Sequence, residues 1–186
     1  NKDKGQLHVL LGALLFVLSL RIGKSVFYNF TDLPVAIKNI GLAANLAIGP
    51  FLLLYGKVLI QQYAFRRREL WHLVPAAIYL VFSPFIPNQA GNLGWYASYT
   101  FVILQQLVYV IAAASLIENW RGAWKNDRQK GFIILCAAIG LIWTIYLLIF
   151  TQLLPVYIFG ASAYSILVIL LAYFLIEEKD LFPRRE

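Results

Sequence analysis

Six long apolar segments, separated by short polar ones, constrain this chain more than any other feature. A helix needs about 20 mostly apolar residues to cross the hydrocarbon core of a bilayer. The six segments cover residues 6–28, 34–64, 70–86, 93–119, 131–154 and 156–177. Backbone polar groups in lipid must be satisfied within a helix, and no alternating strand pattern competes. The sequence therefore predicts an all-α, polytopic transmembrane bundle of six helices.

The composition agrees with a membrane protein. The chain has 186 residues, of which 61% are hydrophobic and 13% are charged, whereas soluble domains are about half apolar and a quarter charged. The net charge is +7, and most of the basic residues lie in short runs between the apolar segments. This placement is typical of loops at a membrane surface. We expect the lipid bilayer as partner and no direct nucleic-acid contact. The bundle is predicted over 1–177, with a cytoplasmic tail or linker at 178–186.

Lysine and arginine placement predicts the orientation of the chain. Twelve of the sixteen basic residues fall in segments that a six-helix topology places on one side. They are Lys2, Lys4, Arg66, Arg67, Arg68, Arg121, Lys125, Arg128, Lys130, Lys179, Arg184 and Arg185. Cytoplasmic loops carry such an excess of basic residues. Both ends of the chain are therefore predicted to be cytoplasmic.

Residue types that carry out catalysis are poorly placed for it. The nine acidic residues lie at helix ends or in loops, whereas ion-coupled transporters usually need a carboxylate near a helix midpoint. Common hydrolase and phosphate-binding motifs are absent. The single cysteine, Cys136, is interpreted as a buried structural thiol. His72 suits a cytoplasmic interface better than haem ligation. We expect no enzymatic activity, no metal site and no cofactor.

The second apolar segment has the most informative helix face. Small or polar residues recur near one stripe, at Gly41, Asn45, Gly49 and Gly56. Small residues let another helix approach, and Asn45 can form a hydrogen bond across such a contact. Pro50 removes a backbone donor, so a kink near Gly49 is predicted. We favour a packing role with a static kink; the alternative is a hinge that transmits a bend to the loop Arg66–Arg68.

Two further groups are candidate contact residues. Arg21, Lys24 and Lys38 lie on the side otherwise poor in basic residues. We favour snorkelling to lipid headgroups; the alternative is a vestibule that binds an anion or a partner. Gln105 and Gln106 fall near the middle of the fourth segment. They form either a structural polar network, which we favour, or part of a ligand pocket.

One stretch resembles a known family. The run IGPFLLLYGKVLI, followed by a basic loop and HLVP, contains Gly49, Pro50, Leu53, Leu54, Tyr55, Lys57, His72 and Pro75. It resembles the multi-helix membrane region that precedes an AraC-type helix-turn-helix domain in membrane-bound bacterial regulators, and related regions that precede histidine kinases. The resemblance implies a bacterial inner-membrane protein, an original set of seven helices whose first precedes Asn1, and an output domain beyond Glu186.

These observations lead to one favoured functional hypothesis and one alternative. The favoured one is a non-enzymatic sensory domain that couples an external or intramembrane signal to a cytoplasmic regulator, such as a transcription factor. Arg66, Arg67, Arg68 and His72 would form its cytoplasmic interface. The alternative is an accessory structural subunit of a larger membrane complex. A homodimer is compatible with both. A transporter is least favoured because no inverted repeat or midplane charge is visible.

Overall fold

A computed structural model describes most of the chain up to residue 153. The described residues are 2–63, 65–89, 91–117, 120–124 and 126–153, together with 165 and 169. Every regular element among them is a helix. The elements are α1 (Lys2–Phe30), α2 (Val35–Ile60), the 3-10 helix η1 (Arg67–Leu73), α3 (Val74–Val81), α4 (Leu93–Ala114), α5 (Trp120–Ala123) and α6 (Asp127–Phe150).

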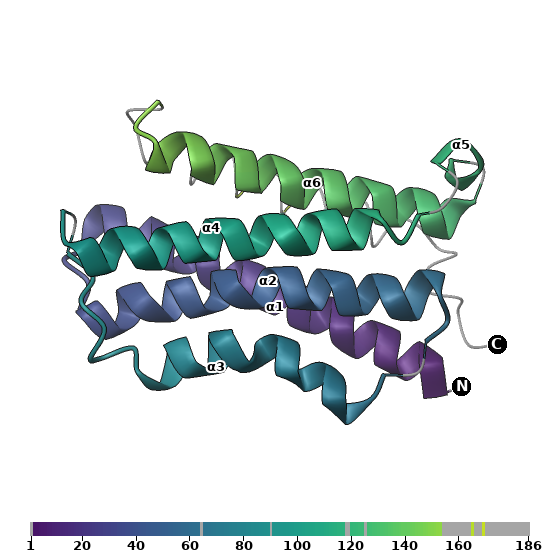
Figure 1. The fold of residues 1–186 in the computed structure, drawn as a ribbon, viewed down its shortest axis with the longest axis horizontal. Coiled ribbons are helices and arrows are strands. Elements are labelled where there is room, and N and C mark those ends of the chain that lie inside the picture. Colours follow the sequence, from purple (N-terminus) through teal and green to yellow (C-terminus); the bar gives the residue numbers. More distant parts are fainter. Residues whose placement is uncertain are drawn as a thin grey trace.

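The long helices run up and down beside one another (Figure 1). The start of α1, the connection between α2 and η1, and the short helix α5 all lie at the same end of the bundle. This end, which carries Arg66–Arg68 and the start of α6, is called the basic end. The opposite end holds the α1–α2 and α3–α4 connections and the end of α6. It is called the cavity end. The clusters 66–68 and 128–130 therefore lie at one end of the bundle.

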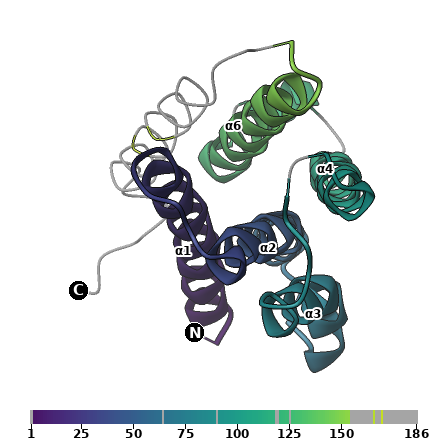
Figure 2. The same cartoon turned by 90° about the vertical axis from the view of Figure 1, so that its left-hand side faces the viewer.

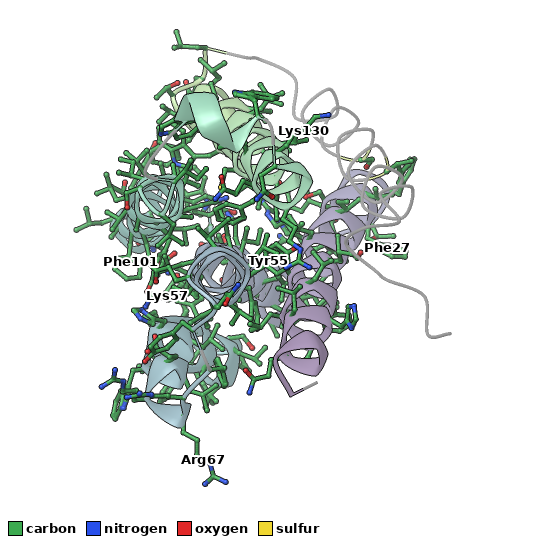
Figure 3. The ribbon with its side chains drawn as sticks, turned by 90° about the vertical axis from the view of Figure 1, so that its right-hand side faces the viewer. Phe27, Tyr55, Lys57, Arg67, Phe101 and Lys130 are labelled. Atoms are coloured by element: carbon green, nitrogen blue, oxygen red, sulfur yellow. The ribbon has the colours of Figure 1, made fainter. Side chains whose placement is uncertain are left out.

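Helix α2 lies at the centre, with α1, α3, α4 and α6 around it (Figure 2). In its most apolar window 83% of the residues are buried inside the protein, against 22% for α4. Helices α2 and α4 are both apolar, but neighbouring helices cover most of α2, whereas much of α4 is left to face lipid. Phe101 of α4 points away from the bundle in this way (Figure 3). The core is thus built around α2.

Three glycines let different neighbours approach α2. A Cβ atom at Gly41 would lie 2.8 Å from the Lys24 side chain of α1, and one at Gly49 would lie 2.6 Å from Tyr109 of α4. A Cβ at Gly56 would meet the ring of Phe132 in α6. The sequence suggested one small-residue stripe for one neighbouring helix. The structure instead distributes the glycines among three neighbours, because α2 is buried on nearly all sides.

The predicted count of six spanning helices is wrong. The described residues form five helices of at least eight residues, and four of these are long and apolar enough to cross a membrane. The predicted helix over 70–86 is a 3-10 helix followed by the eight-residue α3. Pro75 has no N–H to donate to the Trp71 carbonyl, and the Val74 N–H makes that bond in its place. The bond from Val74 to Trp71 spans three residues instead of four, which is the hydrogen-bond pattern of a 3-10 helix.

The segment from η1 to the turn after α3 still follows α2 along its length. At the basic end, Lys57 Nζ of α2 lies 3.2 Å from Glu69 Oε2. At the cavity end, the fully buried Asn39 side chain donates to the carbonyls of Ser83 (2.7 Å) and Ile86 (2.8 Å). These two contacts fasten both ends of the segment to one helix. An amide in an apolar helix needs such partners.

Other helix ends also differ from the sequence prediction. Helix α2 ends at Ile60 rather than near residue 64, and Gln62 follows with a left-handed φ of 52°. Helix α4 ends at Ala114 rather than near 119. The predicted helix over 156–177, except Ser165 and Ile169, and the predicted tail 178–186 lie outside the described residues.

Candidate functional site

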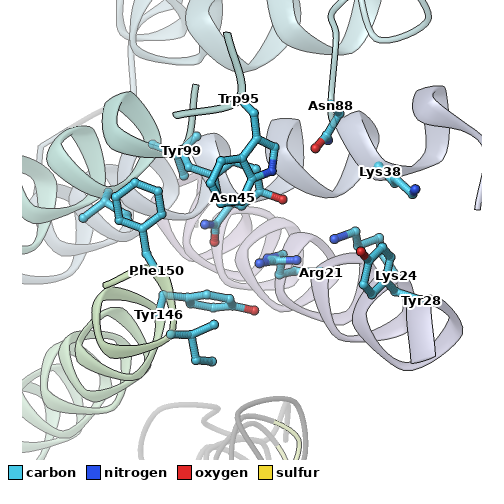
Figure 4. A pocket seen from close by; sticks show the side chains of 13 residues that line it. Arg21, Lys24, Tyr28, Lys38, Asn45, Asn88, Trp95, Tyr99, Tyr146 and Phe150 are labelled. Carbon is cyan, nitrogen blue, oxygen red and sulfur yellow. The ribbon is translucent and has the colours of Figure 1, made fainter. Parts of the chain in front are cut away.

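A cavity of about 280 Å³ lies among α1, α2, α4 and α6 towards the cavity end (Figure 4). Asn45 is ten residues into α2, so at 1.5 Å per residue the cavity reaches about 15 Å into the bundle. That depth is about half of a 30 Å hydrocarbon core. Its lining residues are Arg21, Lys24, Tyr28, Lys38, Asn45, Asn88, Trp95, Tyr99, Val102, Ile103, Tyr146, Ile149 and Phe150.

One wall of the cavity is cationic. Arg21, Lys24 and Lys38, which the sequence placed near the same side, all line it. The side chain of Arg21 is only 2% exposed. Its guanidinium donates to Ser25 Oγ at 3.1 Å and lies 4.4 Å from the centre of the Tyr146 ring. Arg21 therefore turns into the bundle rather than snorkelling to the bundle surface.

The two lysines converge on one aromatic ring. Lys24 Nζ lies 5.1 Å and Lys38 Nζ lies 5.4 Å from the centroid of Tyr28. Cations within about 6 Å of an aromatic centroid are attracted by the ring quadrupole. Gly41 leaves the space in which the methylene stem of Lys24 crosses α2. The Lys24 ammonium thus reaches the cavity because position 41 has no side chain.

The amide of Asn45 lies between the cationic wall and the rest of the cavity. Its side chain is 4% exposed, and its Oδ1 atom has no hydrogen-bond partner among the described residues. Leaving a buried polar atom without a partner costs roughly 1–3 kcal/mol. Asn88, by contrast, donates from Nδ2 to Asn39 Oδ1 at 2.8 Å. Asn45 Oδ1 can therefore accept a hydrogen bond from a bound molecule, whereas Asn88 belongs to the contacts that Asn39 makes with the segment after α3.

The opposite wall is aromatic and comes from α4 and α6. Trp95 and Tyr99 are one helical turn apart, with ring centroids 4.6 Å apart. Phe150 of α6 packs 5.8 Å from Trp95 and is stacked parallel to Tyr99 at 6.3 Å. Tyr146, one turn before Phe150, faces Arg21. Figure 4 shows Trp95, Tyr99 and Phe150 on one side and Arg21, Lys24 and Lys38 on the other.

The electrostatics of the cavity favour an anion. No Asp or Glu is among the described residues that line it, and Asp32 in the nearby α1–α2 connection is exposed. Charges in a low-dielectric, water-poor site interact more strongly than in water. No nucleophile–base pair lines the cavity, and the described residues contain no group of three His, Cys, Asp or Glu that could hold a metal. The arrangement is suited to binding a negatively charged molecule.

A second polar cluster surrounds Glu69 at the basic end. Its carboxylate is 7% exposed and contacts Lys57 (3.2 Å), the Tyr63 hydroxyl (3.3 Å), His72 Nε2 (3.5 Å) and Arg68 Nε (3.7 Å). Burial raises the pKa of Glu69, but the hydrogen bond and charge of Lys57, with Tyr63 and His72, outweigh burial and leave this pKa lowered. The cluster fastens η1 to α2.

The remaining predicted site residues lie around these two clusters. His72 Nδ1 is 2.8 Å from the Tyr109 hydroxyl of α4, and Arg66 and Arg67 are exposed. Arg67 extends away from the bundle in Figure 3. Gly49 and Gln105 lie at the α2–α4 contact. Pro50 is buried in α2 and Gln106 is buried in α4, and none of these four residues lines the cavity.

Two groups of important residues went unnoticed in the sequence. Asn39 organises the α3–α4 connection, and its position within an apolar helix was a signal that it needs partners. Trp95 and Tyr99 form the second group, and their i, i+4 spacing was a signal that they share one helix face. The contact of that face with Phe150 depends on how α4 packs on α6. Spacing within one helix contains no information about that packing.

Comparison with known protein families, curated proteins and solved structures finds no match for this chain.

Proposed function

We propose that this chain is a non-enzymatic, membrane-embedded signal-input domain that binds a small organic anion in the cavity. The observation that carries the proposal is the convergence of Arg21, Lys24 and Lys38 on one cavity whose described lining residues include no carboxylate. Polar and ionisable residues inside a membrane are costly, and they usually mark a ligand or ion site. An anion between these cations would favour the folded, occupied bundle.

Helix α2 is the proposed route from the cavity to the basic end. Asn45 lies in the cavity, and Lys57 lies twelve residues further along the same helix. Lys57 pairs with Glu69, which is next to the loop Arg66–Arg68. A ligand that binds one position of α2 better than another shifts the population of that position. In the proposal, the loop presents this shift to a cytoplasmic regulator or a covalently linked output domain, as in the family that the sequence resembles.

The binding step is tested with benzoate and its neutral analogue benzamide. Purified protein in detergent should be stabilised against heat by benzoate in a concentration-dependent way, and far less by benzamide. Arg21→Gln combined with Lys24→Gln should abolish the benzoate shift. A matched control, Arg66→Gln combined with Arg67→Gln, removes the same charge from exposed positions at the basic end. It should retain the shift.

The same experiment separates the proposal from its alternative. An accessory structural subunit has no requirement for a ligand, so benzoate and benzamide would then act alike. Equal shifts for the two probes, or an unchanged shift in the Arg21/Lys24 variant, would overturn the anion site.

The reporting step is tested with a fluorophore on Arg67→Cys in a Cys136→Ser background. Its emission should change when benzoate saturates the cavity.

A further inference from the structure

We infer that the anion bound in the cavity is an aromatic carboxylate. The inference rests on the proposed anion site and specifies the chemistry of its ligand. The cavity has two chemically different walls, and a ligand that satisfies both must be bipartite. Its charged group belongs with Arg21 and Lys24, and its apolar body belongs against the rings of Trp95, Tyr99 and Phe150.

The cationic wall favours a planar, two-oxygen anion. A guanidinium presents donors in a fork that matches a carboxylate. Arg21 is held by Ser25 on one side and by the Tyr146 ring on the other, so its plane is fixed before a ligand arrives. A group that is already oriented loses less conformational freedom on binding. Asn45 Oδ1, at the boundary between the two walls, has no partner among the described residues and can only accept, so it suits a donor on the body of the ligand and not the carboxylate itself.

The aromatic wall favours a ring over an aliphatic body. Trp95, Tyr99 and Phe150 contact one another at centroid distances of 4.6–6.3 Å, so an incoming ring would extend an existing cluster. Aromatic pairs prefer offset-stacked or edge-to-face geometry with centroids 4.5–7 Å apart. A ligand ring would gain this geometry in addition to ordinary burial.

The size of the cavity limits the ligand to a small molecule. A volume of about 280 Å³ lies just below the range for small-molecule pockets, which is roughly 300–1,000 Å³. Benzoate or a bicyclic aromatic acid is of suitable size. A whole lipid with two acyl chains is far too large. A lipid headgroup alone would supply the charge but no ring for the aromatic wall.

Isothermal titration of the purified chain with benzoate and with cyclohexanecarboxylate tests the ligand class. The two probes carry the same charge, and the saturated ring is the more hydrophobic, so simple burial would favour cyclohexanecarboxylate. We expect benzoate to bind more tightly by a factor of roughly 2–10. Equal affinities, or tighter binding of cyclohexanecarboxylate, would overturn the aromatic assignment and leave the anion site standing. Binding of neither carboxylate would remove both proposals.

Substitutions in the aromatic wall provide the second measurement. Trp95→Leu should reduce the preference for benzoate to about unity while cyclohexanecarboxylate still binds. Tyr99→Leu serves the same purpose if the first variant does not fold. The matched control is Trp124→Leu, an exposed tryptophan near the basic end, which should leave the preference unchanged. An undiminished preference in a folded Trp95 or Tyr99 variant would contradict the inference.

Discussion

The side-chain amide of Gln105 in α4 donates a hydrogen bond to the backbone carbonyl of Leu46 in α2, with an Nε2–O distance of 3.1 Å. Leu46 is four residues before Pro50, and the proline nitrogen has no proton to donate to that carbonyl. A free carbonyl in an apolar bundle is costly. Gln105 therefore supplies from a neighbouring helix the bond that Pro50 removes from its own.

A double-mutant cycle tests this relationship. Gln105→Leu should lower the free energy of unfolding by about 0.5–2 kcal/mol, the range for hydrogen bonds between membrane helices. In a Pro50→Ala background the alanine N–H can satisfy the Leu46 carbonyl, so the same substitution should cost less. Reversible unfolding in mixed detergent measures all four proteins.

The neighbouring glutamine is the control for that cycle. Gln106 Nε2 is buried and has no hydrogen-bond partner among the described residues, so Gln106→Leu should cost less than Gln105→Leu. Identical costs of Gln105→Leu with and without Pro50 would show that the two residues are energetically independent.

Gly49 is predicted to be intolerant of even one methyl group. A Cβ atom there would lie 2.6 Å from Cβ of Tyr109, so Gly49→Ala must push α2 and α4 apart. Overpacking of this kind typically costs about 1–3 kcal/mol. Gly12→Ala is the matched control, because a Cβ at Gly12 meets nothing within 4 Å. It should be neutral or stabilising by up to about 1 kcal/mol through helix propensity. Equal effects on thermal stability would contradict the close contact.

Glu69 should make stability depend on acidity. Its pKa is lowered in the folded protein, so its contribution to stability is present above its ordinary pKa and is lost as pH falls through the lowered value. Glu69→Gln should therefore be less stable than wild type at pH 7, with the difference narrowing below about pH 4.5. Melting temperatures between pH 3 and 7 measure this.

Lys57 supplies the matching variant for the Glu69 cluster. Lys57→Met removes an interaction that lowers the Glu69 pKa, while burial continues to raise it. The gap between the folded and unfolded pKa of Glu69 then shrinks, so the acid-induced loss of stability should be smaller than in wild type. A gap between wild type and Glu69→Gln that stays constant from pH 7 to pH 3 would rule out the paired carboxylate.

The proposed orientation predicts which end of the bundle faces the cytoplasm. In a Cys136→Ser background, Asp32→Cys and Arg67→Cys place single thiols at exposed positions on opposite ends. A membrane-impermeant maleimide should label Asp32→Cys in intact bacterial cells and Arg67→Cys only in inverted vesicles. The reverse pattern would place the cavity end inside the cell.

Hydropathy was informative about the long helices because segment length and apolar content decide whether a helix can span a bilayer. It was misleading at 70–86, where the missing N–H of Pro75 changes the hydrogen-bond pattern within an equally apolar run. Hydropathy also predicted too late an end for α2. The helix ends at Ile60, just before Gln62 takes a left-handed φ, and not where the polarity of the sequence changes.

The candidate site was likewise predictable from the sequence only in part. The unusual charges of Arg21, Lys24 and Lys38 were visible in the sequence because few cations lie on that side of the apolar segments. Their meeting in one cavity was not visible, since it requires Gly41 to admit the Lys24 stem and α6 to bring Tyr146 over Arg21. Contacts between helices far apart in sequence have no local signature.

The most direct test of the account is to locate a bound aromatic carboxylate in the protein. Crystals grown with 4-iodobenzoate would report the iodine position by anomalous scattering. The account predicts a peak inside the α1–α2–α4–α6 cavity beside Trp95 and Phe150, with the carboxylate directed towards Arg21. A peak confined to the lipid-facing surface or the basic end, in crystals saturated with the compound, would contradict the central claim.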